Sequence, residues 1–118
     1  MESEDGARLA YFPSVPEIDK ALLKQVDSVS VLLMDGTFWS DDELIKVRGA
    51  GPTARQIGHV PISGERGTLR ELGSTNVGRK IFVHINNTNP VLNESGEEYR
   101  LVRQAGWEVA EDGWELRL

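Results

Sequence analysis

The sequence predicts an α/β fold, a single domain over residues 1–118 in which strands alternate with helices. Two apolar, β-rich runs at residues 28–34 and 80–85 have the composition of buried strands. Segments with apolar residues three or four positions apart, as in amphipathic helices, lie around these runs. The alternation is typical of βαβ units, and 118 residues are enough to bury one core.

The first third of the chain contains a predicted strand, a helix and a second strand. Residues 8–12 form a short strand candidate that Pro13 ends. A helix is predicted from Val15–Pro16 to about Gln25, because proline suits a first helical turn and the apolar side chains recur every four residues. Residues 28–34 follow as a buried strand, which we expect to run parallel to its neighbours.

The middle of the chain continues the alternation. Ser40–Glu43 resembles a capping box with its serine as the N-cap, which predicts a short helix after it. Further helical turns are predicted at 53–59 and 68–72, a central strand at 80–85 and a helix at 97–104.

The chain ends in a predicted β-hairpin. Residues 107–110 and 114–118 flank Glu111-Asp112-Gly113, and Asp-Gly between two alternating runs is a strong hairpin signal. The hairpin adds an antiparallel strand, so the expected sheet is mixed, with flanking helices. A sheet of four or five strands in so short a chain leaves edges and faces exposed, as expected for half of a larger sandwich.

Composition and charge exclude several classes of function. The chain has 19 acidic and 13 basic residues, a net charge of −6, so we expect neither a nucleic-acid nor a membrane partner. Because there is no cysteine, disulfides, thiolate metal sites and a cysteine nucleophile are excluded. The absence of cysteine suits a reducing compartment, and we expect a cytoplasmic protein.

Asp35 and both histidines lie where α/β proteins place their ligands. Asp35 directly follows the strand at 28–34, and His84 lies near the end of the strand at 80–85, so both should reach one sheet edge. For a shared metal their donor atoms should lie within roughly 3–4 Å, or somewhat farther without the ion. His59 lies in a Gly/Pro-rich loop. This set matches the ligands of a non-haem iron or zinc site, although structural histidines and a simple aspartate turn remain alternatives.

A dense run of polar side chains follows the strand at 80–85, namely Asn86, Asn87, Thr88 and Asn89. These side chains can fix an irregular loop, orient a ligand or hold a metal-bound histidine, or they can simply end the strand. Ser63 lies in a glycine-containing loop near His59 and is a further substrate-loop candidate. No nucleophile elbow surrounds Ser63, so serine hydrolysis is not expected.

Several segments, in this order, resemble the carboxyl-terminal part of the pyrroloquinoline-quinone biosynthesis protein B family, which has a metallo-β-lactamase-like fold. The resemblance runs from about Gly6 to Leu118. The segments are Leu33–Trp39 with Asp41–Glu43, Gly58–Gly64, Arg79–Pro90, Ala105–Ala110 and Asp112-Gly113. The His-Ile-Asn-Asn-Thr-Asn-Pro segment is specific to the family. The resemblance implies half of an αββα sandwich.

The resemblance also implies roles for individual residues. Asp35 and His84 match the late aspartate and histidine of the metal centre, and His59 matches the histidine of the family's Gly-His-x-Pro loop, a catalytic residue. The implied cofactor is iron or zinc, and the implied activity is hydroxylation of a small, peptide-derived tyrosine precursor of the quinone. An alternative description of the family is a carrier that helps transport the cofactor or its precursor to the periplasm.

The sequence departs from the family pattern in its missing first half. Family members are about twice as long, and their first half carries a His-x-His-x-Asp-His metal box that this sequence lacks. The family's cysteine-bound structural zinc is also absent, and Glu94–Tyr99 departs from the usual helix start. We therefore expect a fragment, a split-gene product, a mis-started reading frame or an inactive remnant. The chain alone is expected to be inactive, and its expected partner is the missing N-terminal half or another copy of this chain.

Overall fold

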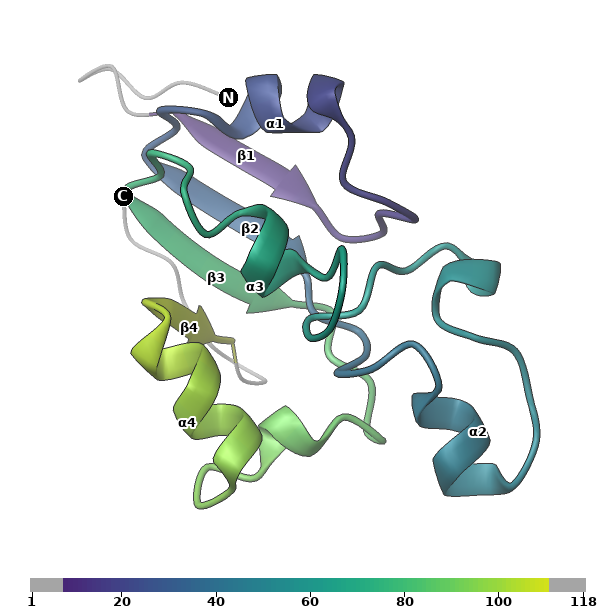
Figure 1. Ribbon diagram of the computed structural model, residues 1–118. Coiled ribbons are helices and arrows are strands. Elements are labelled where there is room, and N and C mark those ends of the chain that lie inside the picture. Colours follow the sequence, from purple (N-terminus) through teal and green to yellow (C-terminus); the bar gives the residue numbers. More distant parts are fainter. Residues whose placement is uncertain (1–7, 111–118) are drawn as a thin grey trace.

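A four-stranded parallel sheet forms the centre of the computed structural model, which describes residues 8–110. The strands lie side by side in sequence order (Figure 1). They are β1 (Leu9–Phe12), β2 (Val31–Asp35), β3 (Arg79–Val83) and β4 (Trp107–Val109). The parallel order follows from the helical crossovers between strands. The antiparallel strand predicted at 114–118, which would make the sheet mixed, lies outside the described residues.

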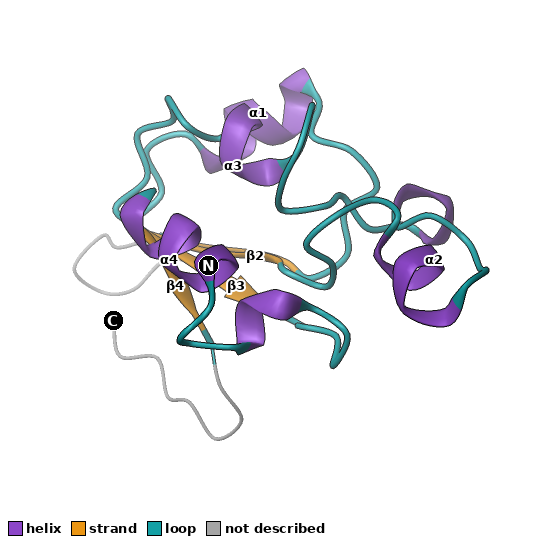
Figure 2. Cartoon of the chain, turned by 60° about the horizontal axis from the view of Figure 1, so that its bottom comes forward, coloured by secondary structure: helices purple, strands orange, loops and turns teal. Residues whose placement is uncertain are grey.

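Short helices connect the strands. They are α1 (Lys20–Val26), α2 (Glu43–Arg48), η1 (Arg55–Ile57), α3 (Thr68–Glu71), η2 (Pro90–Leu92) and α4 (Glu97–Gln104). Figure 2 shows α1 and α3 on one side of the sheet, and α2 apart from it. In Figure 1, α2 lies beyond the arrowheads of β2 and β3. The long connection from β2 to β3 therefore leaves the sheet and returns across its carboxyl-terminal edge.

The two faces of the sheet differ in what covers them. One face carries Leu32, Met34 and Phe82, which form the main core with side chains of α1 and α4. Trp107 stacks on Phe82 with ring centroids 4.0 Å apart. On the opposite face, Tyr11 of the edge strand β1 is 60% exposed, whereas Ile81 of β3 is fully buried.

The first predicted helix is wrong at its start. Helix α1 begins at Lys20, and Asp19 caps it by accepting a hydrogen bond of 2.8 Å from the Leu22 N–H. Val15 lies in the connection before α1, where its N–H donates to Asp35 and its carbonyl accepts from Val60. The bond from Val60 uses the Val15 carbonyl, which a helix starting here would need for its first intrahelical hydrogen bond.

The predicted capping box is also wrong in its N-cap. Helix α2 begins at Glu43, and its N-cap is Asp42 rather than Ser40. The Glu43 carboxylate, 4% exposed, accepts from the Trp39 N–H at 2.7 Å and from the Thr88 hydroxyl at 2.6 Å. The glutamate thus ties α2 to the loop after β3.

Candidate metal centre

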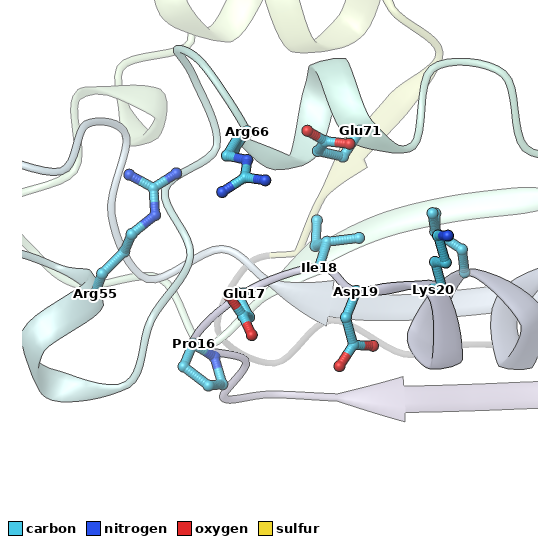
Figure 3. A pocket seen from close by; sticks show the side chains of 9 residues that line it. Pro16, Glu17, Ile18, Asp19, Lys20, Arg55, Arg66 and Glu71 are labelled. Carbon is cyan, nitrogen blue, oxygen red and sulfur yellow. The ribbon is translucent and has the colours of Figure 1, made fainter.

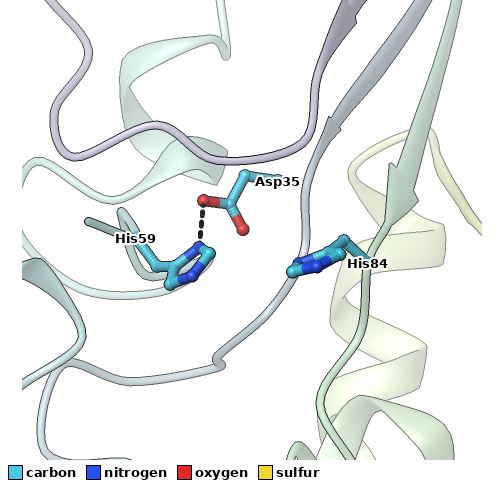
Figure 4. A group of neighbouring side chains, drawn as sticks. All are labelled: Asp35, His59 and His84. Atoms are coloured by element: carbon cyan, nitrogen blue, oxygen red, sulfur yellow. Dashed lines mark hydrogen bonds and ion pairs between the residues drawn. The ribbon is translucent and has the colours of Figure 1, made fainter. Parts of the chain in front are cut away.

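Asp35, His59 and His84 meet at the carboxyl-terminal edge of the sheet. Asp35 ends β2, His84 follows β3, and His59 lies in the loop after η1. One donor atom from each of the three lies within 4.8 Å of the others (Figure 4). The expected approach of Asp35 and His84 is confirmed, and His59 joins them. Parallel neighbouring strands bring their ends together in this way whatever their separation in sequence.

The buried carboxylate of Asp35 accepts four hydrogen bonds. Its Oδ2 accepts from the Val15 N–H and lies beside His59 Nδ1, both at 2.9 Å. Its Oδ1 accepts from the N–H of Thr37 at 3.0 Å and from the hydroxyl of Thr37 at 2.7 Å. A carboxylate without exposure to water needs such donors to offset the loss of its hydration.

The two imidazoles lie next to each other. Their ring centroids are 5.7 Å apart with an interplanar angle of 23°, and Phe38 packs edge-on against His59 at 5.8 Å. The side chain of His59 is 14% exposed, whereas His84 is exposed. The cluster therefore combines a buried carboxyl group with an imidazole that reaches solvent.

His84 has a left-handed backbone, with φ of +59°. This conformation costs a non-glycine residue about 1–2 kcal/mol, and such strain gathers at functional sites. Hydrogen bonds on both sides hold the conformation. The Gly36 N–H donates to the Val83 carbonyl at 2.8 Å, and the Asn86 N–H donates to the Thr37 carbonyl at 3.1 Å.

The polar loop after β3 is held mainly by its own side chains. Asn89, 2% exposed, donates from Nδ2 to the Gly36 carbonyl at 3.0 Å and accepts from the Val91 N–H at 2.9 Å. Asn86 donates to Thr88 at 2.7 Å, and Thr88 in turn donates to Glu43. Among the described hydrogen bonds, none involves the side chain of Asn87.

Ser63 lies apart from the cluster's hydrogen bonds. Its hydroxyl donates to the Trp39 carbonyl at 2.6 Å, and the Ser63 N–H donates to the same carbonyl at 2.9 Å. These bonds join the loop after His59 to the segment after β2.

Thr37 is the residue that the sequence analysis missed. It appeared there only as part of a motif, yet its hydroxyl contacts Asp35, His59 and His84. The spacing of Asp35 and Thr37, two residues apart after a strand, is typical of a side chain that accepts from the backbone ahead of it. That spacing could have indicated Thr37, whereas nothing local indicates the contact from Val15.

A cavity lies elsewhere, between α1 and the loops around η1 and α3 (Figure 3). Its volume is about 710 Å³, and neither histidine lines it. Its charged lining balances, with three acidic and three basic side chains. These are Glu17, Asp19, Glu71, Lys20, Arg55 and Arg66. A balanced lining gives no preference for an anionic or a cationic ligand, so we place the candidate site at Asp35, His59 and His84.

The chain resembles known proteins over nearly its whole length. A family model described as a beta-lactamase superfamily domain matches residues 1–85. Coenzyme PQQ synthesis protein B of Methylobacterium nodulans is 45% identical over 118 residues, covering 100% of this chain and 40% of that protein. The protein of the same name from Xanthomonas oryzae pv. oryzae is 40% identical over 111 residues, 94% of this chain and 37% of that protein.

A solved structure has the same fold. The crystal structure of Zn(2+)-bound PqqB from Methylobacterium extorquens matches with a TM-score of 0.91 and 41% identity, over 96% of this chain and 40% of that chain. This chain thus spans about 40% of the length of the relatives it matches. Within residues 8–110, no helix is both long and apolar enough to cross a membrane. The structural match confirms the expected metallo-β-lactamase-like fold. The relatives confirm the resemblance to the pyrroloquinoline-quinone biosynthesis protein B family. The chain belongs to the beta-lactamase superfamily domain family.

Proposed function

We propose that this chain provides part of a metal centre in a protein of pyrroloquinoline quinone biosynthesis. The observation that carries the proposal is the convergence of one buried carboxylate and two imidazoles within 4.8 Å. Relatives named coenzyme PQQ synthesis protein B, one of them solved with zinc, support the assignment. Asp35 and His84 would hold the ion, either iron or zinc.

The donor set fits such an ion. Zinc and iron accept carboxylate oxygen and imidazole nitrogen, and zinc lies about 2.0–2.2 Å from each such atom. Two ligand atoms of one ion are therefore at most about 4 Å apart. The observed limit of 4.8 Å can be closed by small side-chain movements. Because Asp35 already accepts four hydrogen bonds, an ion at its carboxylate would displace one of these donors.

The proposed reaction class is oxygenation of a peptide-derived tyrosine precursor. A bound iron ion would supply the redox chemistry toward oxygen that this reaction needs. His59 would act as the catalytic acid or base, because its Nδ1 is held by Asp35 and its Nε2 can then take or give a proton. The loop of Asn86, Asn87, Thr88 and Asn89, together with Ser63, would shape the substrate side of the site.

We propose that a partner completes the centre. The three donors supplied here leave room for more, and a catalytic metal site needs several well-placed ligands. Tyr11, 60% exposed on the edge strand β1, offers an apolar contact for such a partner. The missing N-terminal half is the partner we favour and a second copy of this chain is the other candidate, so the chain alone is expected to be inactive.

Metal titration tests the assignment. Calorimetry with zinc, and with iron(II) under nitrogen, should give weak binding to the chain and none to the Asp35→Asn variant. Asp42→Asn is the matched control, because Asp42 is an exposed aspartate paired with Lys46. Tight stoichiometric binding that survives His84→Ala would show that the site lies elsewhere.

The carrier function is the second candidate. It is favoured by the Asp35 carboxylate, whose hydrogen bonds are all satisfied by the chain itself, so that the cluster can serve as a polar binding site without an ion. Fluorescence titration with the quinone in the presence of a chelator distinguishes the two functions. Binding that is unchanged by chelator and by added metal favours the carrier for transport of the quinone or its precursor.

A further inference from the structure

The hydroxyl of Thr37 lies at the centre of the cluster and has three side-chain partners. Thr37 Oγ1 is 2.7 Å from Asp35 Oδ1, 3.1 Å from His59 Nδ1 and 3.0 Å from His84 Nδ1. Thr37 is only 5% exposed, so these contacts replace water rather than compete with it. Both imidazoles therefore present the same ring nitrogen to one oxygen.

Counting hydrogens settles which atom donates in each contact. A threonine hydroxyl has one hydrogen and two lone pairs, whereas a carboxylate accepts only. The short contact with Asp35 Oδ1 uses that one hydrogen. The oxygen of Thr37 must then accept from both imidazoles, so the Nδ1 of each ring carries a hydrogen.

The two histidines depend on Thr37 to different degrees. His59 Nδ1 also lies 2.9 Å from Asp35 Oδ2, and this second acceptor favours the same Nδ1–H form without Thr37. Within residues 8–110, Thr37 Oγ1 is the one hydrogen-bond partner found for His84 Nδ1. Loss of the hydroxyl should therefore free His84 and leave His59 in place.

We infer that Thr37 is a positioning residue that holds His84 in the Nδ1–H tautomer. The Nε2 lone pair of His84 is then the free one, and it is the atom that this ring offers to a ligand. The hydrogen bond made by one ring nitrogen commonly fixes which nitrogen binds a metal. The tautomer assignment stands by itself, and only its consequence for metal affinity rests on the proposed function.

Nitrogen NMR of the full chain tests the tautomers directly. The sequence has two histidines, so long-range proton–nitrogen spectra of the ¹⁵N-histidine-labelled chain contain only these two rings. At alkaline pH we expect both to show the Nδ1–H pattern. In Thr37→Val, His84 should move toward the Nε2–H form that free histidine favours in water, while His59 keeps its pattern. Thr37→Ser, which retains the hydroxyl, should restore His84.

A matched variant controls for the loss of a buried threonine. Thr68 is also fully buried, and its hydroxyl has no hydrogen-bond partner within the described part of the chain. Thr68→Val should leave both histidine patterns unchanged. An Nε2–H pattern for His84 in the unmodified chain, or a His84 pattern unaffected by Thr37→Val, would overturn the inference. The first of these tests needs no variant, so it holds even if Thr37→Val fails to fold.

Metal affinity separates this inference from the proposed function. Removing the partner of a metal-bound histidine typically lowers metal affinity about 10- to 100-fold. Zinc calorimetry should therefore show a loss of that size in Thr37→Val and recovery in Thr37→Ser. A chain that binds no zinc but has the expected tautomers contradicts the proposed metal centre and supports the assignment of Thr37. Wild-type zinc affinity in a Thr37→Val chain whose His84 has changed tautomer overturns the positioning role.

Discussion

Replacing His84 by glycine and by alanine separates its backbone strain from its side-chain contacts. Both variants lose the imidazole and the hydrogen bond to Thr37, so their difference reports the left-handed backbone at φ +59°. Glycine avoids a cost of about 1–2 kcal/mol but loses about 0.5–1 kcal/mol more backbone entropy on folding. We expect His84→Gly to be more stable than His84→Ala by about 0.5–1 kcal/mol, or a few degrees in Tm.

Urea denaturation followed by circular dichroism measures the difference. Arg66, exposed and also left-handed at φ +59°, is a second site where glycine should exceed alanine. Lys24, exposed within α1, should give the opposite sign, with glycine less stable by about 1 kcal/mol. Equal stability of the two His84 variants, with the expected signs at Arg66 and Lys24, would refute strain at His84.

Three further predictions concern the glycine that follows Asp35, the ion pair of Arg79 and Glu108, and the edge strand β1. Gly36→Ala should destabilise the chain and weaken metal binding, because the added Cβ would lie 2.7 Å from Phe82 Cβ. Thermal melts and calorimetry check this, and unchanged stability and metal affinity would contradict it. The hydrogen bond from Arg79 holds the pKa of Glu108 below its ordinary value of 4.5. The pair should therefore stabilise the fold above that value, by about 0.5 kcal/mol given its partial exposure, and lose this as pH falls through the lowered pKa. Urea melts should show an Arg79→Gln deficit at pH 7 that vanishes in acid, and a deficit independent of pH would contradict the pairing. The chain alone should self-associate through the edge strand β1, where Tyr11 is exposed, so light scattering should give a mass above that of the monomer. Tyr11→Lys should lower this mass, and a monomeric parent chain would contradict the prediction.

The fold was predictable because its signals are local. Helix α4 spans Glu97–Gln104 as expected, since Gly96 directly precedes it and Gly106 follows its C-cap, Ala105. The strands β2 and β3 stand out as apolar runs, and their parallel pairing follows from the crossover. The start of α1 was not predictable, because Val15 is bonded to Asp35, twenty residues later in the chain.

The site was predictable in its members more than in its geometry. Asp35 and His84 could be placed at one edge because each follows a buried strand. The central hydroxyl of Thr37 and the left-handed backbone of His84 depend on two loops meeting in space. Neither feature has a periodic pattern, so sequence spacing alone could not reveal them.

The chain's own hydrogen bonds join the loops that follow β2 and β3. The Gly36 N–H bonds to the last residue of β3, and the Asn86 N–H bonds back to the Thr37 carbonyl. The buried amide of Asn89 adds bonds to the carbonyls of Gly36 and Thr37. The donors of the cluster are therefore ordered by the fold, and ligand binding need not supply that ordering entropy. It follows that weak metal binding by this chain would reflect too few ligands rather than a flexible site, and added ligands from a partner should raise affinity steeply.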